Sequence, residues 1–307
     1  MTAEQKKFEA ALKERLAERA RLLLGSNQKV VALLRDAWVQ ISQQLAAQPA
    51  DWRQWQLVRL RDQLDTILTA TGQQAGATVN LALQGAWQQG EDMVDKTLAA
   101  IDHNVQLRLG MLDARVLAAM QTFGVDRMRD VTEVAAGKIG QQLGLVTIGG
   151  ITPFEAIKAV QGILDADSTR RATAIVTTEV SRAFAVAGNE RLVQAAPLVP
   201  GLGKQWRRSG KIHSRWNHDI IDGQVVDADK PFKVPNPGGG FDLMQCPHDP
   251  KAPVEQVIHC GCVSLPWMKQ WKVMTPGAKP FTERELKLDG RKAALDQAAK
   301  RAGARKE

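Results

Sequence analysis

The chain has no tyrosine and only three cysteines among its 307 residues. An odd number of cysteines, two of them in Cys260-Gly-Cys262, does not suit the disulfide framework of a secreted protein. The sequence therefore favours a reducing compartment. The first residues are charged and lack the apolar core of a signal peptide. No run approaches roughly 18 apolar residues, so no membrane span is expected.

Positive charge outweighs negative charge near the C-terminus. The formal net charge is +8, and residues 269–307 contain eleven Lys or Arg against five Asp or Glu, a surplus of six. Such a basic tail attracts nucleic acid phosphates, an anionic membrane or an acidic protein surface. It could equally be a solvated helix that keeps the protein soluble. We expect this tail to be helical or disordered.

Residues 1–148 are predicted to be a helical region. Strong helix formers dominate the stretch Glu4–Leu24, and apolar residues recur there at helical spacing. Gly25-Ser26-Asn27 predicts a break before a second helix, and residues 48–51 predict a stop followed by a new start. Glycines in the later helices would allow close helix contacts; they are Gly72, Gly76, Gly85 and Gly90.

A boundary is expected at Gly149-Gly150. Thr152-Pro153-Phe154-Glu155 follows and has the residues of a capping box, which predicts a helix to about Leu164. A separate, longer helix is expected to start at residues 165–168. From about residue 203 glycine and proline become dense, and short strands are expected at Val225-Val226 and Phe232–Val234. The fold class is therefore α+β: a helical region at 1–148, a small motif-rich domain with short strands and long loops at 149–268, and the basic tail at 269–307.

Metal-ligating side chains are concentrated in one segment. Four of the five histidines and all three cysteines lie between His213 and Cys262. Thiolate and imidazole suit zinc, which favours a tetrahedral set of Cys and His ligands. We therefore name His218, Cys260, Cys262 and Cys246 as candidate ligands of one structural zinc. Two further histidines, His248 and His259, are alternatives for the fourth position. The same residues could instead be a buried cysteine pair beside a hydrogen-bonded histidine, or could hold a catalytic metal.

A second group is interpreted as structural rather than catalytic. Asp222-Gly223 predicts a conformationally demanding turn, and Arg215 beside a carboxylate is a common way to anchor one. Glu179 is a candidate partner of Arg215 or of a backbone amide. Trp206 lies between Glu179 and Arg215 in the sequence and belongs to the same group.

The order of these features resembles the phage Mu F-like minor head protein family, also called the phage head morphogenesis domain. The likeness covers about residues 152–267. It is carried by Thr178-Glu179, Trp206, Arg215-x-x-His218, Asp222-Gly-Gln224, Pro247-x-Asp249-Pro250 and Cys260-x-Cys262. Gly261 stands where the family has arginine. The additional Cys246 and His248 lie beside the Pro-x-Asp-Pro element.

The resemblance implies a minor capsid protein that acts in head morphogenesis and is not an enzyme. Such a protein would be assembled into the virion in the cytoplasm of a bacterial host. Its expected partners are the portal or major capsid protein, with packaged DNA touched through the basic tail and no membrane. The alternative is a metal-dependent nuclease, but His218 could not easily serve both as a metal ligand and as a catalytic base. A DNA-binding module is a third hypothesis, weakened because only the tail is strongly basic.

Overall fold

The structure is a computed structural model that describes residues 2–47, 54–101, 103, 109–209, 215–236, 238–271 and 273. His213 and nearly all of the predicted basic tail lie outside these residues. The chain divides into two compact units, each built from separate stretches of sequence. Unit 1 comprises Met1–Ala20, Gly85–Ala114 and the chain from Ser181 onward, and unit 2 comprises Arg21–Gln84 and Arg115–Val180. The predicted segments 1–148, 149–268 and 269–307 stay predictions.

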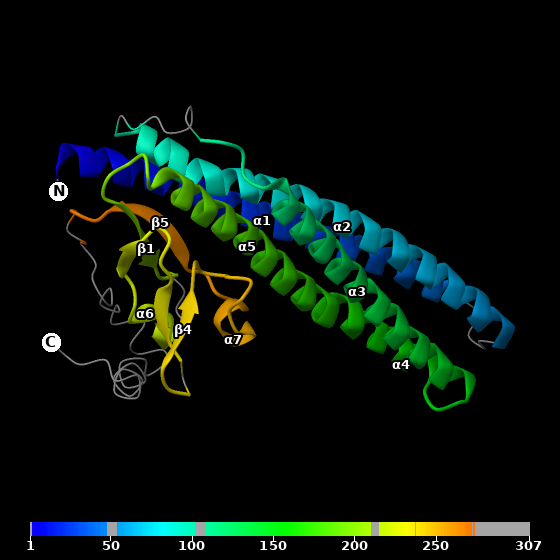
Figure 1. Cartoon of the computed structure of the whole chain (residues 1–307). Coiled ribbons are helices and arrows are strands. Elements are labelled where there is room, and N and C mark those ends of the chain that lie inside the picture. Colours follow the sequence, from blue (N-terminus) through cyan, green and yellow to red (C-terminus); the bar gives the residue numbers. More distant parts are fainter. Residues whose placement is uncertain are drawn as a thin grey trace. The chain divides into compact units, whose positions relative to one another are not determined.

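The N-terminal region is helical, as predicted, but its helices are longer than the sequence suggested. Helix α1 runs from Ala3 to Ala46 and α2 from Gln54 to Ala99 (Figure 1). The predicted break at residues 25–27 is wrong. The Ser26 hydroxyl donates to the Leu22 carbonyl at 2.7 Å and the Asn27 amide to the Leu23 carbonyl at 3.0 Å, so both side chains bond within the helix. One glycine costs only about 1 kcal/mol, too little to end a helix whose apolar face is buried.

The second half of the helical structure comprises α3 (Ala114–Thr147), α4 (Pro153–Gln161), a π-helix at Gly162–Ser168 and α5 (Thr169–Ala195). The capping box is confirmed: the Thr152 side chain accepts from the Glu155 amide, and the Glu155 carboxylate accepts from the Thr152 amide at 2.7 Å. The separate start predicted at 165–168 is wrong. There the Ser168 hydroxyl bonds the Ile163 carbonyl, five residues back, and the helix continues through the π turn.

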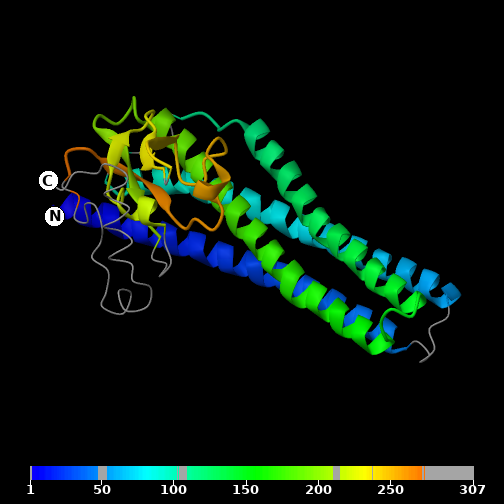
Figure 2. The same ribbon diagram turned by 90° about the horizontal axis from the view of Figure 1, so that it is seen from below.

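Unit 2 is a bundle of helical segments around an apolar core, and these segments run alongside one another in Figures 1 and 2. The core draws buried residues from α1, α2, α3, α4 and the π-helix; among them are Ile41, Leu60, Leu64, Ile139 and Val160. A Cβ added at Gly72 would lie 2.4 Å from the Thr132 hydroxyl. The glycine therefore permits the close approach of α2 and α3 that its presence predicted.

The described residues of unit 1 form five short strands. These are β1 (Leu202–Arg207), β2 (Val225–Asp227), β3 (Phe232–Pro235), β4 (Phe241–Met244) and β5 (Val263–Met268). One antiparallel sheet has the order β2-β1-β5, and β3 pairs with β4 as a separate antiparallel hairpin. The predicted strands at Val225-Val226 and Phe232–Val234 are confirmed. The short helices α6 (Trp216–Asp219) and α7 (Val254–Val257) lie between these strands in sequence.

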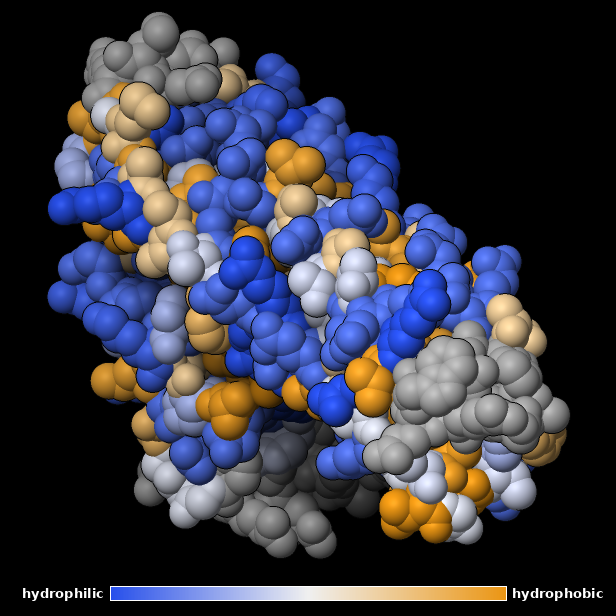
Figure 3. All heavy atoms as spheres, turned by 90° about the vertical axis from the view of Figure 1, so that its right-hand side faces the viewer, coloured by the Kyte–Doolittle hydropathy of each residue, from blue (hydrophilic) through white to orange (hydrophobic). Residues whose placement is uncertain are grey.

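Aromatic side chains attach the start of α1 to the sheet within unit 1. The ring of Phe8 is edge-on to Trp267 and Trp271, with centroids 6.4 and 4.8 Å away. None of the described helices is long and apolar enough to cross a bilayer. On the face drawn in Figure 3, hydrophilic side chains predominate and hydrophobic ones are dispersed among them.

Candidate metal centre

Three of the four predicted ligands are brought together by two short segments of unit 1. His218 lies on α6, which begins directly after Arg215. Cys260 and Cys262 lie between the end of α7 and the start of β5. The β1–β5 pairing sets Trp206 opposite Ser264, so the strand that leads toward α6 runs beside the strand that follows the cysteines. Residues about forty positions apart in the chain therefore meet.

The ligand atoms of this group are close together and buried. His218 Nδ1 lies 3.5 Å from Cys260 Sγ and 3.6 Å from Cys262 Sγ. One candidate ligand atom from each of the three residues lies within 4.8 Å of the other two. The exposed fractions of His218, Cys260 and Cys262 are 1%, 3% and 2%. This group, found among the described residues, could hold a metal ion.

The histidine is oriented by a second layer of polar residues. His218 Nε2 lies 2.9 Å from Gln256 Oε1, which also accepts from the Asn217 amide at 2.9 Å. The Gln256 amide nitrogen donates to the Asp242 carboxylate at 2.6 Å, which fixes which end of the glutamine faces the ring. Because Gln256 Oε1 can only accept, His218 carries its proton on Nε2. Its Nδ1 lone pair is therefore directed toward the two sulfur atoms, as in metal-bound histidines.

The two thiols have opposite pKa shifts. The hydrogen bond with Cys262 lowers the pKa of Cys260 well below the usual thiol value, against desolvation and with smaller contributions from His218 and His248. The same hydrogen bond, together with burial, raises the pKa of Cys262. A lowered pKa favours the thiolate form of Cys260, and thiolate is the form that binds metal. Arg19 of α1 is near enough for the charge of both cysteines to raise its pKa, although burial lowers that pKa to about 10.

Large apolar side chains close the site. Trp206 is fully buried and edge-on to both His218 and Phe232, with ring centroids 5.3 Å apart in each case. The cluster that contains Cys260 and Cys262 also includes Ile221, Phe232, Val234 and Met244. These neighbours exclude water from the ligand group.

The remaining histidines and cysteine of the segment differ in their surroundings. Cys246 is a buried free cysteine that does not belong to the group of three. Burial raises its pKa, while the charge of Lys204 opposes that shift. His259 is exposed although it precedes Cys260 directly, whereas His248 is completely buried.

Arg208, rather than Arg215, lies beside the carboxylate of the predicted turn. The Arg215 guanidinium donates to the Ile258 carbonyl. Arg208 lies 3.5 Å from the Asp219 carboxylate and 3.8 Å from that of Asp222, and its backbone amide donates to Asp222 Oδ1 at 2.9 Å. Arg208 was not among the residues predicted from the sequence. Its signal would have been a pair of arginines directly after the Trp206 strand.

The predicted turn at Asp222-Gly223 has the expected backbone. Gly223 has φ +85°, a left-handed conformation that favours glycine, and its amide donates to the Trp206 carbonyl at 2.8 Å. The turn thereby connects α6 to β1. Glu179 is buried on α5, within unit 2.

Comparison with known proteins found no match: no protein family, no curated protein and no solved structure is significantly similar to this chain. The function therefore has to be argued from the residues of the site and from the motif order in the sequence.

Proposed function

We propose that this chain is a structural assembly protein, a phage minor head protein whose motif-rich part is stapled by one zinc ion. The single observation that supports a structural role is the closure of the ligand group. A catalytic zinc keeps one coordination position open to water or substrate, whereas a structural zinc is enclosed by protein. His218, Cys260 and Cys262 are each at most 3% exposed.

The distances favour zinc as the ion. A tetrahedral zinc with bonds of about 2.3 Å to sulfur and about 2.0 Å to nitrogen separates those two atoms by about 3.5 Å. The His218 Nδ1 atom lies 3.5 and 3.6 Å from the two sulfur atoms. A nitrogen and two sulfurs are also a softer ligand set than magnesium or calcium prefers.

The nuclease alternative is poorly supported by the same contacts. A nuclease needs a histidine base that can reach water and carboxylates that are free to bind a second, harder ion. Both nitrogens of His218 are engaged, one by Gln256 and the other by the cysteines. The nearby carboxylates of Asp219 and Asp222 face Arg208.

The minor head role rests on the resemblance stated from the sequence. One observation supports this role. Residues of the family motif contact one another in a buried part of unit 1; they are Trp206, His218, Cys260 and Cys262. We propose that the portal or the major capsid protein is the partner. Packaged DNA would be contacted through the basic tail.

Three measurements test this function. Elemental analysis of the purified full-length chain should find one zinc per chain. Mass spectrometry of purified heads from a phage that encodes this chain should detect it at low copy number, and its absence from both procapsids and filled heads would contradict the proposal. The zinc-loaded chain with added magnesium should leave plasmid DNA intact. Cleavage that disappears in His218→Ala would favour the nuclease instead.

A further inference from the structure

His248 is a histidine without a partner in the interior of unit 1. It follows β4 in the loop Cys246-Pro247-His248-Asp249 and is 0% exposed. Neither its Nδ1 nor its Nε2 atom makes a hydrogen bond of normal geometry to any described residue, although the ring is close enough to the Cys260 thiol to help lower its pKa. No other described side chain leaves two buried polar atoms without a partner. Because buried polar groups in proteins are nearly always bonded, this imidazole requires an explanation.

The backbone of His248 is held in an uncommon conformation. Its φ is +64°, in the left-handed region that few residues other than glycine adopt. Asp249 holds the loop in this shape: its carboxylate accepts from the Gln245 amide at 2.7 Å and from the Lys251 amide at 2.9 Å. Strained backbone that its surroundings enforce in this way is concentrated at functional sites.

A buried lysine fixes the same loop from β1. Lys204 Nζ donates to the Gln245 carbonyl at 2.8 Å, to the Gln245 side-chain oxygen at 3.0 Å and to Asn189 Oδ1 at 2.8 Å. The position of His248 is therefore set by β1 and by Asp249, without any hydrogen bond from its own ring.

The loop lies beside the cysteine pair. Met244, at the end of β4, belongs to the same buried cluster as Cys260 and Cys262, and Ala252 packs against that cluster from the other end of the loop. The ring of His248 is also near enough to Cys260 to lower the pKa of that thiol. The imidazole of His248 thus lies near Cys260, outside the three residues whose ligand atoms already lie within 4.8 Å of one another.

We propose that His248 is the fourth ligand of the metal ion, which completes a tetrahedral site with His218, Cys260 and Cys262. The inference rests on the proposed structural zinc and assigns its last coordination position. Ligation would give the imidazole the partner that it lacks. It would also explain why the chain holds a histidine in a left-handed conformation at this position, where asparagine or glycine would be at least as easily accommodated.

The test compares His248→Asn with His259→Asn in the full-length chain. Asparagine tolerates the left-handed backbone but is a poor zinc ligand, and His259 is an exposed histidine that also has positive φ, +58°. Loss of a residue that only orients a ligand weakens metal binding by roughly 10–100-fold. If His248 is a direct ligand, His248→Asn should therefore lower the zinc affinity at least about 100-fold. The affinity is measured by competition with a chromophoric chelator. His259→Asn should match the wild type.

Cobalt substitution gives a second readout that does not depend on stability. The wild type loaded with Co²⁺ should have the intense visible bands of a four-coordinate tetrahedral ion. His248→Asn should lose intensity as water enters, and His248→Cys should restore tetrahedral bands with a stronger thiolate-to-cobalt absorption. If His248→Asn kept the wild-type affinity and spectrum, or if Cys246→Ser lost them instead, His248 would not be the ligand.

Failure of the inference can be separated from failure of the proposed function. A wild-type chain that binds neither zinc nor cobalt would overturn both. A wild-type chain that binds one ion, with loss in His218→Ala and Cys260→Ser but not in His248→Asn, would overturn only the assignment of His248.

Discussion

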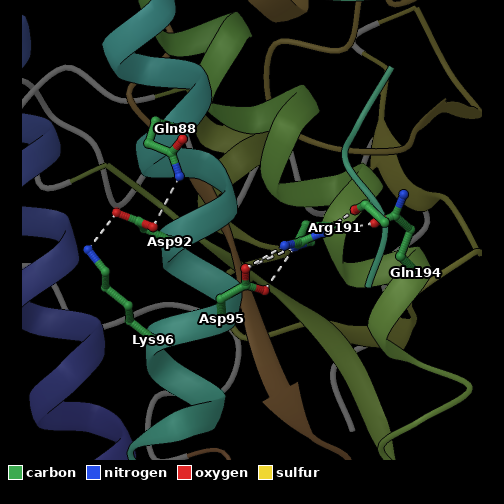
Figure 4. A network of polar contacts seen from close by, with 7 residues as sticks. Gln88, Asp92, Asp95, Lys96, Arg191 and Gln194 are labelled. Carbon is green, nitrogen blue, oxygen red and sulfur yellow. Dashed lines mark hydrogen bonds and ion pairs between the residues drawn. The ribbon is translucent and has the colours of Figure 1, made fainter. Parts of the chain in front are cut away.

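Two buried polar clusters of unit 1 differ in whether their polar atoms find hydrogen-bond or ion-pair partners. The first joins α2 to α5 through Asp95 and Arg191, whose side chains are 2% and 7% exposed (Figure 4). The second is the group of His218, Cys260 and Cys262, with the ring of His248 near Cys260. Both remove polar groups from water, which is unfavourable unless each group finds a partner.

The Asp95–Arg191 cluster is complete within the chain. Arg191 Nε lies 2.9 and 3.0 Å from the two Asp95 oxygens, and its NH2 group donates to Asp95 at 2.7 Å. The remaining nitrogen donates to the Gly110 carbonyl at 2.8 Å and to Gln194 at 3.1 Å. Opposite charges are neutralised, and every nitrogen of the guanidinium has an acceptor.

In the histidine and cysteine cluster, by contrast, some buried polar atoms have no hydrogen-bond partner. The two ring nitrogens of His248 are buried and have no hydrogen-bond partner of normal geometry. The sulfur atoms of Cys260 and Cys262 both contact the same atom, His218 Nδ1. The comparison teaches that burial alone does not distinguish a structural ion pair from a metal site. What distinguishes them is whether lone pairs remain after the chain's own donors and acceptors have been matched.

The largest expected effect is on the metal centre. Structural zinc contributes about 10–16 kcal/mol of binding free energy in small zinc domains. Chelation, or Cys260→Ser, should therefore destabilise unit 1 by several kcal/mol and abolish the near-ultraviolet circular dichroism of its buried tryptophans. Thermal melts with and without chelator measure this. Cys246→Ser is the matched control and should stay sensitive to chelation; unchanged melts in both conditions for the wild type would argue against a structural metal.

The second largest effect is expected at the Asp95–Arg191 cluster. Asp95→Asn leaves the buried Arg191 charge without its counter-ion and should cost about 3–5 kcal/mol, equally with and without chelator. Asp92→Asn is the control, because its partner Lys96 is half exposed and such pairs contribute about 0–1 kcal/mol. Urea denaturation of both variants measures the difference. Equal losses would mean that burial of the pair is energetically unimportant.

The apolar core of unit 2 provides a reference without polar groups. Leu64→Ala removes a side chain that is 1% exposed and should cost about 2–5 kcal/mol through lost burial and a cavity. The loss should be insensitive to chelation, as denaturation with and without chelator would reveal. A chelator-dependent loss would show that the metal centre is energetically coupled to the unit 2 core.

The smallest effect lies at the start of α4. Thr152→Ala removes the capping box and should cost about 1 kcal/mol, because one backbone amide loses its acceptor. Thr66→Ala is a suitable comparison, since the Thr66 hydroxyl only bonds a carbonyl within its own helix. Its substitution should change stability by less than about 0.5 kcal/mol in the same denaturation experiment. Equal losses would exclude a specific capping contribution.

Local features such as a helix cap could be predicted from the sequence. Whether a helix continues through a stretch of low helix propensity could not. Thr152 and Glu155 interact over three residues, so their spacing alone predicts the cap. Gly25-Ser26-Asn27 looked like a break because its propensity is low. Burial of the helix face on either side, and the bonds of Ser26 and Asn27 to preceding carbonyls, outweigh that propensity.

By itself, the sequence determined which types of ligand side chain are present in the candidate metal centre. It also determined the helical or extended state of most segments, because that state depends on nearest neighbours and periodicity. Only the tertiary structure decided which ligands meet. The antiparallel register of β1 and β5 brings the segments of His218 and Cys260 together, while Cys246 lies outside the group of three. Spacing along the chain cannot specify such contacts, since they depend on how distant segments pair and pack.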